Sequence, residues 1–281
     1  MATIGIDIAD SEGRGANWST AKSAGHLHFA GLRCAYGTAP DAGYKGYVQQ
    51  LDVAGVPHFP YLFNRWGVGT PEAQAHAGLE AAYGGATPNW HSFPLCIDVE
   101  GDRNGLSANE AYAWLLKIYT TVKASIGVEP LIYTSKVYWE DPAGMNNHPA
   151  PELSQCPGWI KFWPWPVRSP AVYDPAVVDK LPPPPAPSFF EAVPIEQYQG
   201  DALGYPGLLS TCDMDRIILV QQGTAGGNVR WIQRRVGATV DGIFGPITKQ
   251  KVAAFQASRG LAADGIVGLD TWQALAWVPA A

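Results

Sequence analysis

Residues 94–100 read PLCIDVE, an apolar run that carries two carboxylates at its end. In an extended strand alternate side chains share a face, so Asp98 and Glu100 point the same way while the apolar residues that alternate with them pack behind. Apolar strands that end in acids are typical of the active face of an α/β barrel. The alternative is a strand end whose acids face water or pair with Arg or Lys. We favour a catalytic pair of carboxylates.

The first 200 residues alternate between strand-like and helix-like segments. The strand-like segments are 2–9, 28–37, 56–63, 94–100, 130–139, 158–166 and 193–200, and the helix-like segments are 17–25, 47–55, 73–84 and 108–127. Repeated units of this kind predict an α/β fold whose parallel sheet closes into a TIM-like (β/α) barrel, incomplete or modified. The Pro-rich segment 181–188 is expected to be extended and stiff. Strand-like residues follow it, so we interpret it as a barrel loop rather than a domain linker.

A second, smaller unit follows a break at 221–228, where Gly, Thr and Ala replace the apolar periodicity. Behind the break DGIFGPIT at 241–248 recurs as DGIVGLDT at 264–271. Three helix-like stretches accompany this repeat and predict a small all-α domain of three helices. The helix-like stretches are 229–236, 249–256 and 272–277. The predicted domains are 1–221 and 228–281, with a linker at 222–227.

The composition describes a globular chain. With 281 residues, of which 47% are hydrophobic, it can bury a sizeable core. No apolar stretch approaches the roughly 20 residues that cross a bilayer, so membrane insertion is not expected. The cysteines are widely spaced, without CxxC or Cys/His clustering, so we expect buried free thiols, no metal site and no cofactor. They are Cys34, Cys96, Cys156 and Cys212.

The net charge of −6 hides an asymmetry. From Asn228 onward six basic residues stand against three acidic ones, a net charge of +3, whereas the rest of the chain holds 13 basic and 22 acidic residues, a net charge of −9. A basic terminal module suits attraction to an anionic surface. The alternative is that these charges only solvate a small helical domain. A nucleic-acid partner is not expected.

The motifs WIQ, DGIFGPIT, VAAFQ and GLAADGIVGLDTW lie between Val229 and Leu275. They resemble the LQ, DGxFGxxT, AVxxFQ and GLxxDGxxGxxTW signature of the three-helix peptidoglycan-binding domain. The resemblance implies that this part of the chain carries an enzyme to the bacterial cell wall. Bacterial peptidoglycan is therefore the expected partner, and we expect the protein to be a monomer.

A second set of motifs spans Ile4 to Arg216: GIDIA, IDVE, LIYTS, EQY and DMDR. This order resembles the family-25 glycoside hydrolases, lysozymes that cut the glycan of peptidoglycan. Their pattern begins with GIDVS, continues through an LDIE or DVE strand and an IYT strand, and closes with QY and a DxDxN-like element. The resemblance implies a muramidase barrel.

The same resemblance assigns the acids. Glu100 matches the proton donor, and Asp98 matches the carboxylate that stabilises positive charge on the sugar or its acetamido group. Asp7 and Asp215 match flanking acids that bind substrate, although either could instead cap a turn or pair locally. Asp215 fits the family position better than Asp213. One acid must stay protonated and one ionised, and crowded like charges separate their pKa values. Covalent and substrate-assisted mechanisms both stay open.

Aromatic side chains are further candidates for substrate contact: Tyr36, Tyr61, Trp159, Trp163, Trp165 and Tyr198. Tyr61 lies where the resembled family carries a cleft tyrosine. Tyr36 stands where that family has an acid, Leu62 replaces a histidine, and Glu196 replaces a tryptophan. Packing in the core is the alternative for each aromatic ring. The substitutions permit an unusual specificity.

The leading hypothesis is a modular cell-wall lytic enzyme that breaks the β-1,4 bond after N-acetylmuramic acid. The alternatives are a wall-binding protein with weakened catalysis and a chitinase-like glycosidase. The segment MATIGID has no basic and apolar leader, so no signal peptide is visible. We therefore expect a phage endolysin made in the host cytoplasm and released to the wall, or a mature extracellular enzyme.

Overall fold

The computed structural model describes residues 3–279 except positions 11, 25, 87, 89, 164–171 and 175. In these residues eight strands close a barrel, in the order β1, β9, β8, β7, β6, β5, β4, β2 and back to β1. All neighbours run parallel except β9, which is antiparallel to β1 and β8. The strands are β1 (Ile4–Ile8), β2 (Leu27–Tyr36), β4 (His58–Phe63), β5 (Cys96–Asp98), β6 (Leu131–Thr134), β7 (Pro157–Lys161), β8 (Ala192–Ala202) and β9 (Cys212–Ile217), with β3 (Ala39–Pro40) added beside β2. The predicted modified barrel is confirmed.

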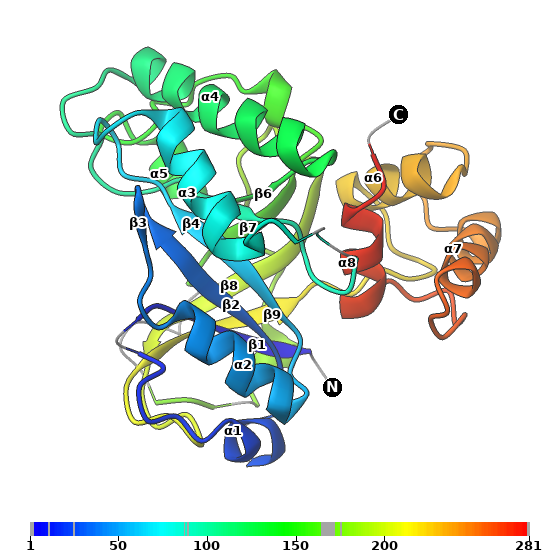
Figure 1. Ribbon diagram of the computed structural model, residues 1–281. Coiled ribbons are helices and arrows are strands. Elements are labelled where there is room, and N and C mark those ends of the chain that lie inside the picture. Colours follow the sequence, from blue (N-terminus) through cyan, green and yellow to red (C-terminus); the bar gives the residue numbers. More distant parts are fainter. Residues whose placement is uncertain are drawn as a thin grey trace.

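Helices cover the outside of the barrel next to β2, β4, β5 and β6 (Figure 1). They are α1 (Trp18–Ala24), α2 (Tyr44–Ala54), α3 (Pro71–Tyr83), α4 (Ala108–Ile126) and the short α5 (Lys136–Glu140). The sequence fixes where the two longest begin. Thr70 accepts a hydrogen bond from the amide of Ala73 ahead of α3, and Ser107 forms a reciprocal capping box with Glu110 ahead of α4.

The outer face of β8 and β9 is covered differently. The short 3₁₀ turn η2 (Val178–Lys180) and the start of the Pro-rich segment lie against it. Arg216 of β9 donates to the Glu196 carboxylate at 2.6 Å and to the carbonyls of Val178 and Pro182. Glu196 is fully buried, and burial raises its pKa to about 7 although Arg216 lowers it. This buried pair fastens the Pro-rich segment to the barrel.

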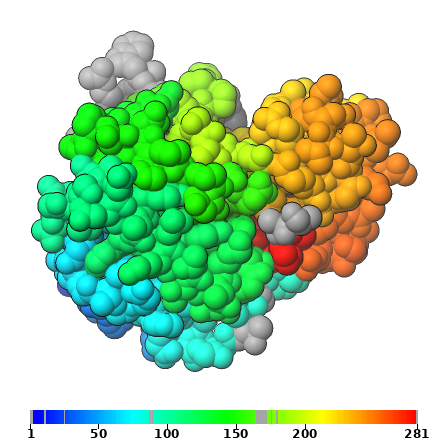
Figure 2. Space-filling model, turned by 90° about the horizontal axis from the view of Figure 1, so that it is seen from above, coloured from blue at the N-terminus to red at the C-terminus, as the bar shows by residue number. Residues whose placement is uncertain are grey.

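The C-terminal module consists of α6 (Gly227–Val236), α7 (Pro246–Ser258) and α8 (Leu269–Ala276). Figure 2 shows it as a lobe, coloured from yellow-orange to red, beside the barrel. The internal repeat has a physical reason. Gln233 at the end of α6 donates to Asp241 and Thr248 of the first copy and accepts from the amide of Gly242. Gln256 of α7 makes the same three bonds to the second copy. Each copy is a turn clamped by the preceding helix.

We call the end of the barrel at which the parallel strands begin its lower end. The module closes this end, and it lies to the right of the barrel in Figure 1. Three indole N–H groups donate to backbone carbonyls outside the module: Trp231 to Gln155, Trp272 to Ile218 and Trp277 to Ser92. Val220 and Val267 pair as a β-bridge. The interior of the barrel and the module share one apolar cluster, which includes Phe29, Phe59, Ile217, Trp231 and Trp272. We call this contact the barrel floor.

The predicted linker 222–227 is hydrogen-bonded to the module. The amide of Gly223 donates to Phe244, and the amide of Gly226 donates to Gly242. The domain limits themselves stay a prediction. The four cysteines are buried and free, as expected. In the described part of the chain no helix has the length and apolar character to cross a membrane.

We predict that barrel and module unfold in one cooperative transition. Trp272→Ala removes a buried indole and its hydrogen bond to Ile218, so it should lower the free energy of unfolding of the whole chain by about 3–5 kcal/mol. Denaturant unfolding measures the free energy of unfolding, and scanning calorimetry shows whether one or two transitions occur. Ile247→Ala on the exposed face of α7 is the control and should change stability by less than about 0.5 kcal/mol. Two separate transitions, with the barrel transition unmoved by Trp272→Ala, would contradict the prediction.

Candidate active site

Acidic side chains gather in a polar cavity of about 170 Å³ at the upper mouth of the barrel, where the parallel strands end. The residues that line it are Asp7, Ala9, Glu12, Arg33, Tyr61, Phe63, Asp98, Glu100, Tyr133, Trp159, Gln197 and Asp213. Five of them are carboxylic acids and one is an arginine. The barrel explains this meeting, because side chains at the ends of neighbouring parallel strands point to one mouth.

The two acids of the PLCIDVE segment both line this cavity, as the alternation of a strand predicts. Asp98 is the last residue of β5 and is 5% exposed. Glu100 lies just beyond the strand, and its side chain keeps 28% of its exposure. Trp66 donates its indole N–H to the carbonyl of Glu100, and Thr134 donates its hydroxyl to the carbonyl of Val99. These bonds hold the chain in place behind the two acids.

Gln197 of β8 joins the other acids. Its amide nitrogen donates to Asp7 at 2.9 Å and to Asp213 at 3.0 Å. Its amide oxygen accepts from the hydroxyl of Tyr133 at 2.9 Å. One side chain therefore fixes acids from β1 and β9 relative to a tyrosine of β6. The EQY motif contained this residue, but the sequence alone gave it no role.

Asp213, rather than Asp215, lines the cavity, and this corrects the choice made from the sequence. Asp215 is fully buried below the cavity and accepts a hydrogen bond from the indole of Trp159 at 2.7 Å. The reason is the direction of β9. In an antiparallel strand the residue nearer the upper mouth comes earlier in the chain, so Asp213 lies above Asp215. Recognising that β9 reverses would have found it.

Burial controls the ionisation of these acids. It raises the pKa of Asp98, and the carboxylate of Glu100 raises it further, whereas Lys161 and Arg33 lower it. Burial also raises the pKa of Asp7, with Asp215 and Asp213 adding to the effect. The pKa of Asp213 rises to about 6, again chiefly through burial. Charged carboxylates in this cavity lack the solvation that water would give them.

Sequence reasoning missed both Glu12 and Arg33. Glu12 lies in the loop after β1 and accepts from the amide of Ala9, and burial raises its pKa. No strand periodicity marks that loop, so no signal in the sequence singles Glu12 out. Arg33 pairs with Asp41 at 2.8 Å and borders the same cavity. Together they add one negative and one positive group to the predicted set.

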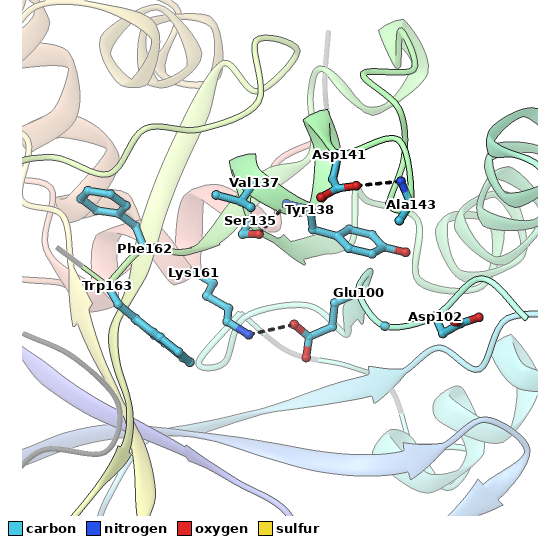
Figure 3. A pocket seen from close by; sticks show the side chains of 12 residues that line it. Glu100, Asp102, Ser135, Val137, Tyr138, Asp141, Ala143, Lys161, Phe162 and Trp163 are labelled. Atoms are coloured by element: carbon cyan, nitrogen blue, oxygen red, sulfur yellow. Dashed lines mark hydrogen bonds and ion pairs between the residues drawn. The ribbon is translucent and has the colours of Figure 1, made fainter.

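A larger cleft of about 700 Å³ adjoins the polar cavity (Figure 3). Glu100 lines both spaces, so it stands on their border. The cleft is bounded by Tyr138 of α5 on one side and by Lys161 and Trp163 on the other. Trp163 lies against Gly200 of β8, where a Cβ atom would come within 2.3 Å of the indole. The glycine leaves room for a flat aromatic wall.

The aromatic residues predicted to contact substrate lie in different places. Tyr61 and Trp159 line the polar cavity, and Trp163 lines the cleft. Tyr36 lines neither space, because it lies on the surface against Phe63 with the guanidinium groups of Arg33 and Arg65 over its ring. Two further predicted residues are placed as follows. Tyr198 is fully buried in the apolar cluster on the outer side of the barrel that also holds Tyr205 and Met214, and Trp165 lies outside the described residues.

The substitutions relative to the resembled family fall mostly outside the mouth. Leu62 packs on the outer face of β4 against Gly78, and Glu196 pairs with Arg216 on the outer face of β8. Neither side chain borders the polar cavity or the cleft. In the described residues no group of three or more His, Cys, Asp or Glu side chains is arranged to hold a metal ion.

Two family patterns match the chain. Residues 6–175 match glycosyl hydrolases family 25, and residues 225–275 match a peptidoglycan binding domain. Lysozyme M1 of Streptomyces globisporus is 27% identical over 165 residues, which are 57% of this chain and 54% of that protein. The zinc D-Ala-D-Ala carboxypeptidase of Streptomyces albus G is 43% identical over 61 residues, 19% of this chain and 24% of that one. The chain thus spans about half the length of the first relative and a quarter of the second.

Solved structures agree on the fold. The bacterial lysozyme from Streptomyces coelicolor superposes with a TM-score of 0.62 at 21% identity, covering 77% of this chain and 92% of that one. A family-25 lysozyme from Aspergillus fumigatus gives 0.62 at 20% identity, covering 78% and 94%. The catalytic domain of an endolysin from a Listeria monocytogenes bacteriophage gives 0.54 at 20% identity, covering 78% and 94%.

We predict that Asp98→Asn stabilises the protein near pH 7. The pKa of Asp98 is raised in the folded state, so its favourable contribution is present below the unfolded pKa and is lost as the pH rises through the folded pKa. A neutral amide avoids that loss. The melting temperature should exceed that of the native protein by about 2–6 °C at pH 7, and the difference should vanish near pH 3.

Scanning calorimetry across this pH range measures the difference. Asp52→Asn is the control, because the Asp52 side chain is 66% exposed, and it should leave the melting temperature within about 1 °C at every pH. An Asp98→Asn protein that is less stable at pH 7 than at pH 3, relative to the native protein, would contradict the burial argument.

Proposed function

Since the chain belongs to family 25 of the glycosyl hydrolases, we propose that it is a muramidase that hydrolyses the β-1,4 bond between N-acetylmuramic acid and N-acetylglucosamine in bacterial peptidoglycan. The observation that carries the proposal is the meeting of Asp98 and Glu100 in one polar cavity that opens on a cleft of about 700 Å³. Glycoside hydrolysis needs two carboxyl groups beside the scissile bond.

Glu100 acts as the general acid. It stands on the border of the cavity and the cleft and keeps part of its exposure, so a sugar bound in the cleft meets its carboxyl group. A proton from Glu100 to the glycosidic oxygen lets the leaving sugar depart as an alcohol. Partial burial of this kind allows substrate to displace the remaining water.

Asp98 stabilises the positive charge that develops on the sugar or its acetamido group. It lies deeper than Glu100 and away from bulk water, so its negative charge acts across a medium of low polarity. Arg33 and Lys161 lower the pKa of Asp98 against the effect of burial and so favour its ionised form. The pair thus divides the two tasks that the reaction requires.

Asp7 and Asp213 hold the rest of the cavity through Gln197. Their carboxylates offer acceptors for sugar hydroxyl groups, and the amide of Gln197 keeps both from turning away. Tyr61 and Trp163 present aromatic surface at the cavity and the cleft, which suits the apolar face of a sugar ring. Asp215 acts from below by holding the indole of Trp159.

The C-terminal module is proposed to bind the same polymer. Its sequence matches a peptidoglycan binding domain, and its net charge of +3 suits an anionic wall. Two modules directed at one substrate support a wall-lytic enzyme, and we propose that it works as a monomer. We further propose that it reaches the wall as a phage endolysin does, from the cell that makes it, or as an extracellular enzyme.

We predict that Glu100→Gln abolishes catalysis while leaving wall binding intact. The amide has the shape of the acid but no proton to give, so release of muramic-acid reducing ends from purified cell walls should fall by about 100-fold or more. Mass spectrometry of the released fragments identifies the new ends. Glu72→Gln on the outer face of α3, where Glu72 pairs with Lys117, is the matched control and should retain full activity.

Other outcomes would select another function. Binding to walls without release of fragments from the native protein would indicate a wall-binding protein with weakened catalysis. Cleavage of chitin oligosaccharides alone would indicate a chitinase-like enzyme. Equal activity of the native protein and Glu100→Gln would remove Glu100 from the mechanism.

A further inference from the structure

Lys161 at the end of β7 holds an unusual position beside the acids. Its ammonium group lies 3.2 Å from a carboxylate oxygen of Glu100 and 4.8 Å from the centre of the Trp163 ring (Figure 3). The side chain is 30% exposed and lines the cleft rather than the polar cavity. In the described residues that border the cleft, it is the one basic side chain.

The position of the ammonium group is set by two neighbours, one of which is itself held in place. Glu100 accepts its hydrogen bond, and the indole of Trp163 lies beneath it. Gly200 in turn receives that indole flat against β8, since any larger residue would displace it. A lysine held in this way cannot turn freely into the solvent, so its charge acts on the acids from a constant place.

The charge of Lys161 is felt by more than one acid. It lowers the pKa of Asp98 and that of Asp213, against the burial that raises both. The titratable groups that share the cleft with Lys161 come from the segment after β5 and from α5 and its end: they are Glu100, Asp102, Tyr138 and Asp141. The polar cavity on the other side of Glu100 adds Asp7, Glu12, Arg33, Asp98, Tyr133 and Asp213.

We propose that Lys161 is a positioning residue that holds the Glu100 carboxyl group at the border of the cleft and sets the pH range in which the acid cluster works. The proposal rests on the proposed muramidase function. Lys161 donates no proton to the substrate and acts only through the carboxylates. Its charge offsets part of an excess of acids, since the described lining of the polar cavity holds five acids and one basic residue, Arg33.

The expected direction follows from charge alone. The positive charge of Lys161 stabilises the ionised carboxylates. Without it, the acids of the cluster lose their protons at higher pH. Since these acids interact, the two limbs of the pH profile of kcat/KM report apparent pKa values of the whole cluster rather than of single residues. Both limbs of the bell-shaped profile should therefore move to higher pH when Lys161 becomes neutral.

Lys161→Met tests this, because methionine keeps the apolar stem and removes the charge. In the full-length protein, kcat/KM for release of reducing ends from cell walls is measured from pH 3 to pH 9. Both limbs should shift upward by about half to one pH unit, a moderate effect for a partly exposed ion pair. Lys161→Arg keeps the charge and should retain limbs close to those of the native protein. A purely structural lysine would lower the rate at all pH values without moving either limb.

A second measurement needs no activity. The positive charge stabilises ionised carboxylates in the folded state, so its stabilising effect is absent below the unfolded carboxyl pKa values and grows as the pH rises through the folded ones. The melting temperatures of the native protein and Lys161→Met should therefore coincide near pH 3 and diverge toward pH 7, with the variant lower. Lys161→Arg should follow the native protein.

The outcomes separate the two proposals. Unmoved limbs together with a pH-independent difference in melting temperature would overturn the role of Lys161 while leaving the muramidase function intact. A native protein that releases no reducing ends would overturn the proposed function, and the melting curves would still decide whether Lys161 controls the ionisation of the cluster.

Discussion

Carboxylates withdrawn from water and crowded together lose free energy of solvation and repel each other, and the upper mouth of this barrel holds five of them. Four of them are held by a specific neighbour: Gln197 bonds to Asp7 and Asp213, the amide of Ala9 binds Glu12, and Lys161 pairs with Glu100. In the described structure the fifth, Asp98, keeps one buried carboxylate oxygen without a hydrogen-bond partner. The barrel must be rigid enough to keep these groups from separating. Much of the remaining structure can be understood as support for this mouth.

That support comes from all sides of the barrel. Capped helices brace β2 to β6, and where helices are absent the Glu196 and Arg216 pair ties the Pro-rich segment across β8 and β9. Below, the indoles of the module complete the barrel floor. A buried ion pair contributes little net stability, so its main effect is to specify which segment lies on the outer face.

The sequence predicted the closed barrel, the acid pair of β5 and the three-helix module because each depends on local patterns: alternation, strand ends and a repeated turn. It failed where a contact depends on direction or on distant partners. Asp215 was preferred over Asp213 on the family resemblance, and nothing local marks β9 as antiparallel, the direction that brings Asp213 to the cavity. Tyr198 was counted as a substrate contact because one strand residue alone does not reveal which face is inside. Lys161 gains its importance from Glu100, which is far away in the chain, and Glu12 lies in a loop that no periodicity marks.

The barrel floor has a mechanical consequence. An enzyme tethered through a loose linker searches every direction within its reach, whereas here the anchoring module is locked beneath the barrel and the cleft opens at the far end. If the module binds glycan and the cleft cuts it, as proposed, the bound strand and the strand being cut lie toward opposite ends of the barrel. The module would then bind one layer of the wall while the cleft cuts glycan in another layer. The spacing between layers, rather than the length of a linker, would decide which glycosidic bonds can reach the cleft.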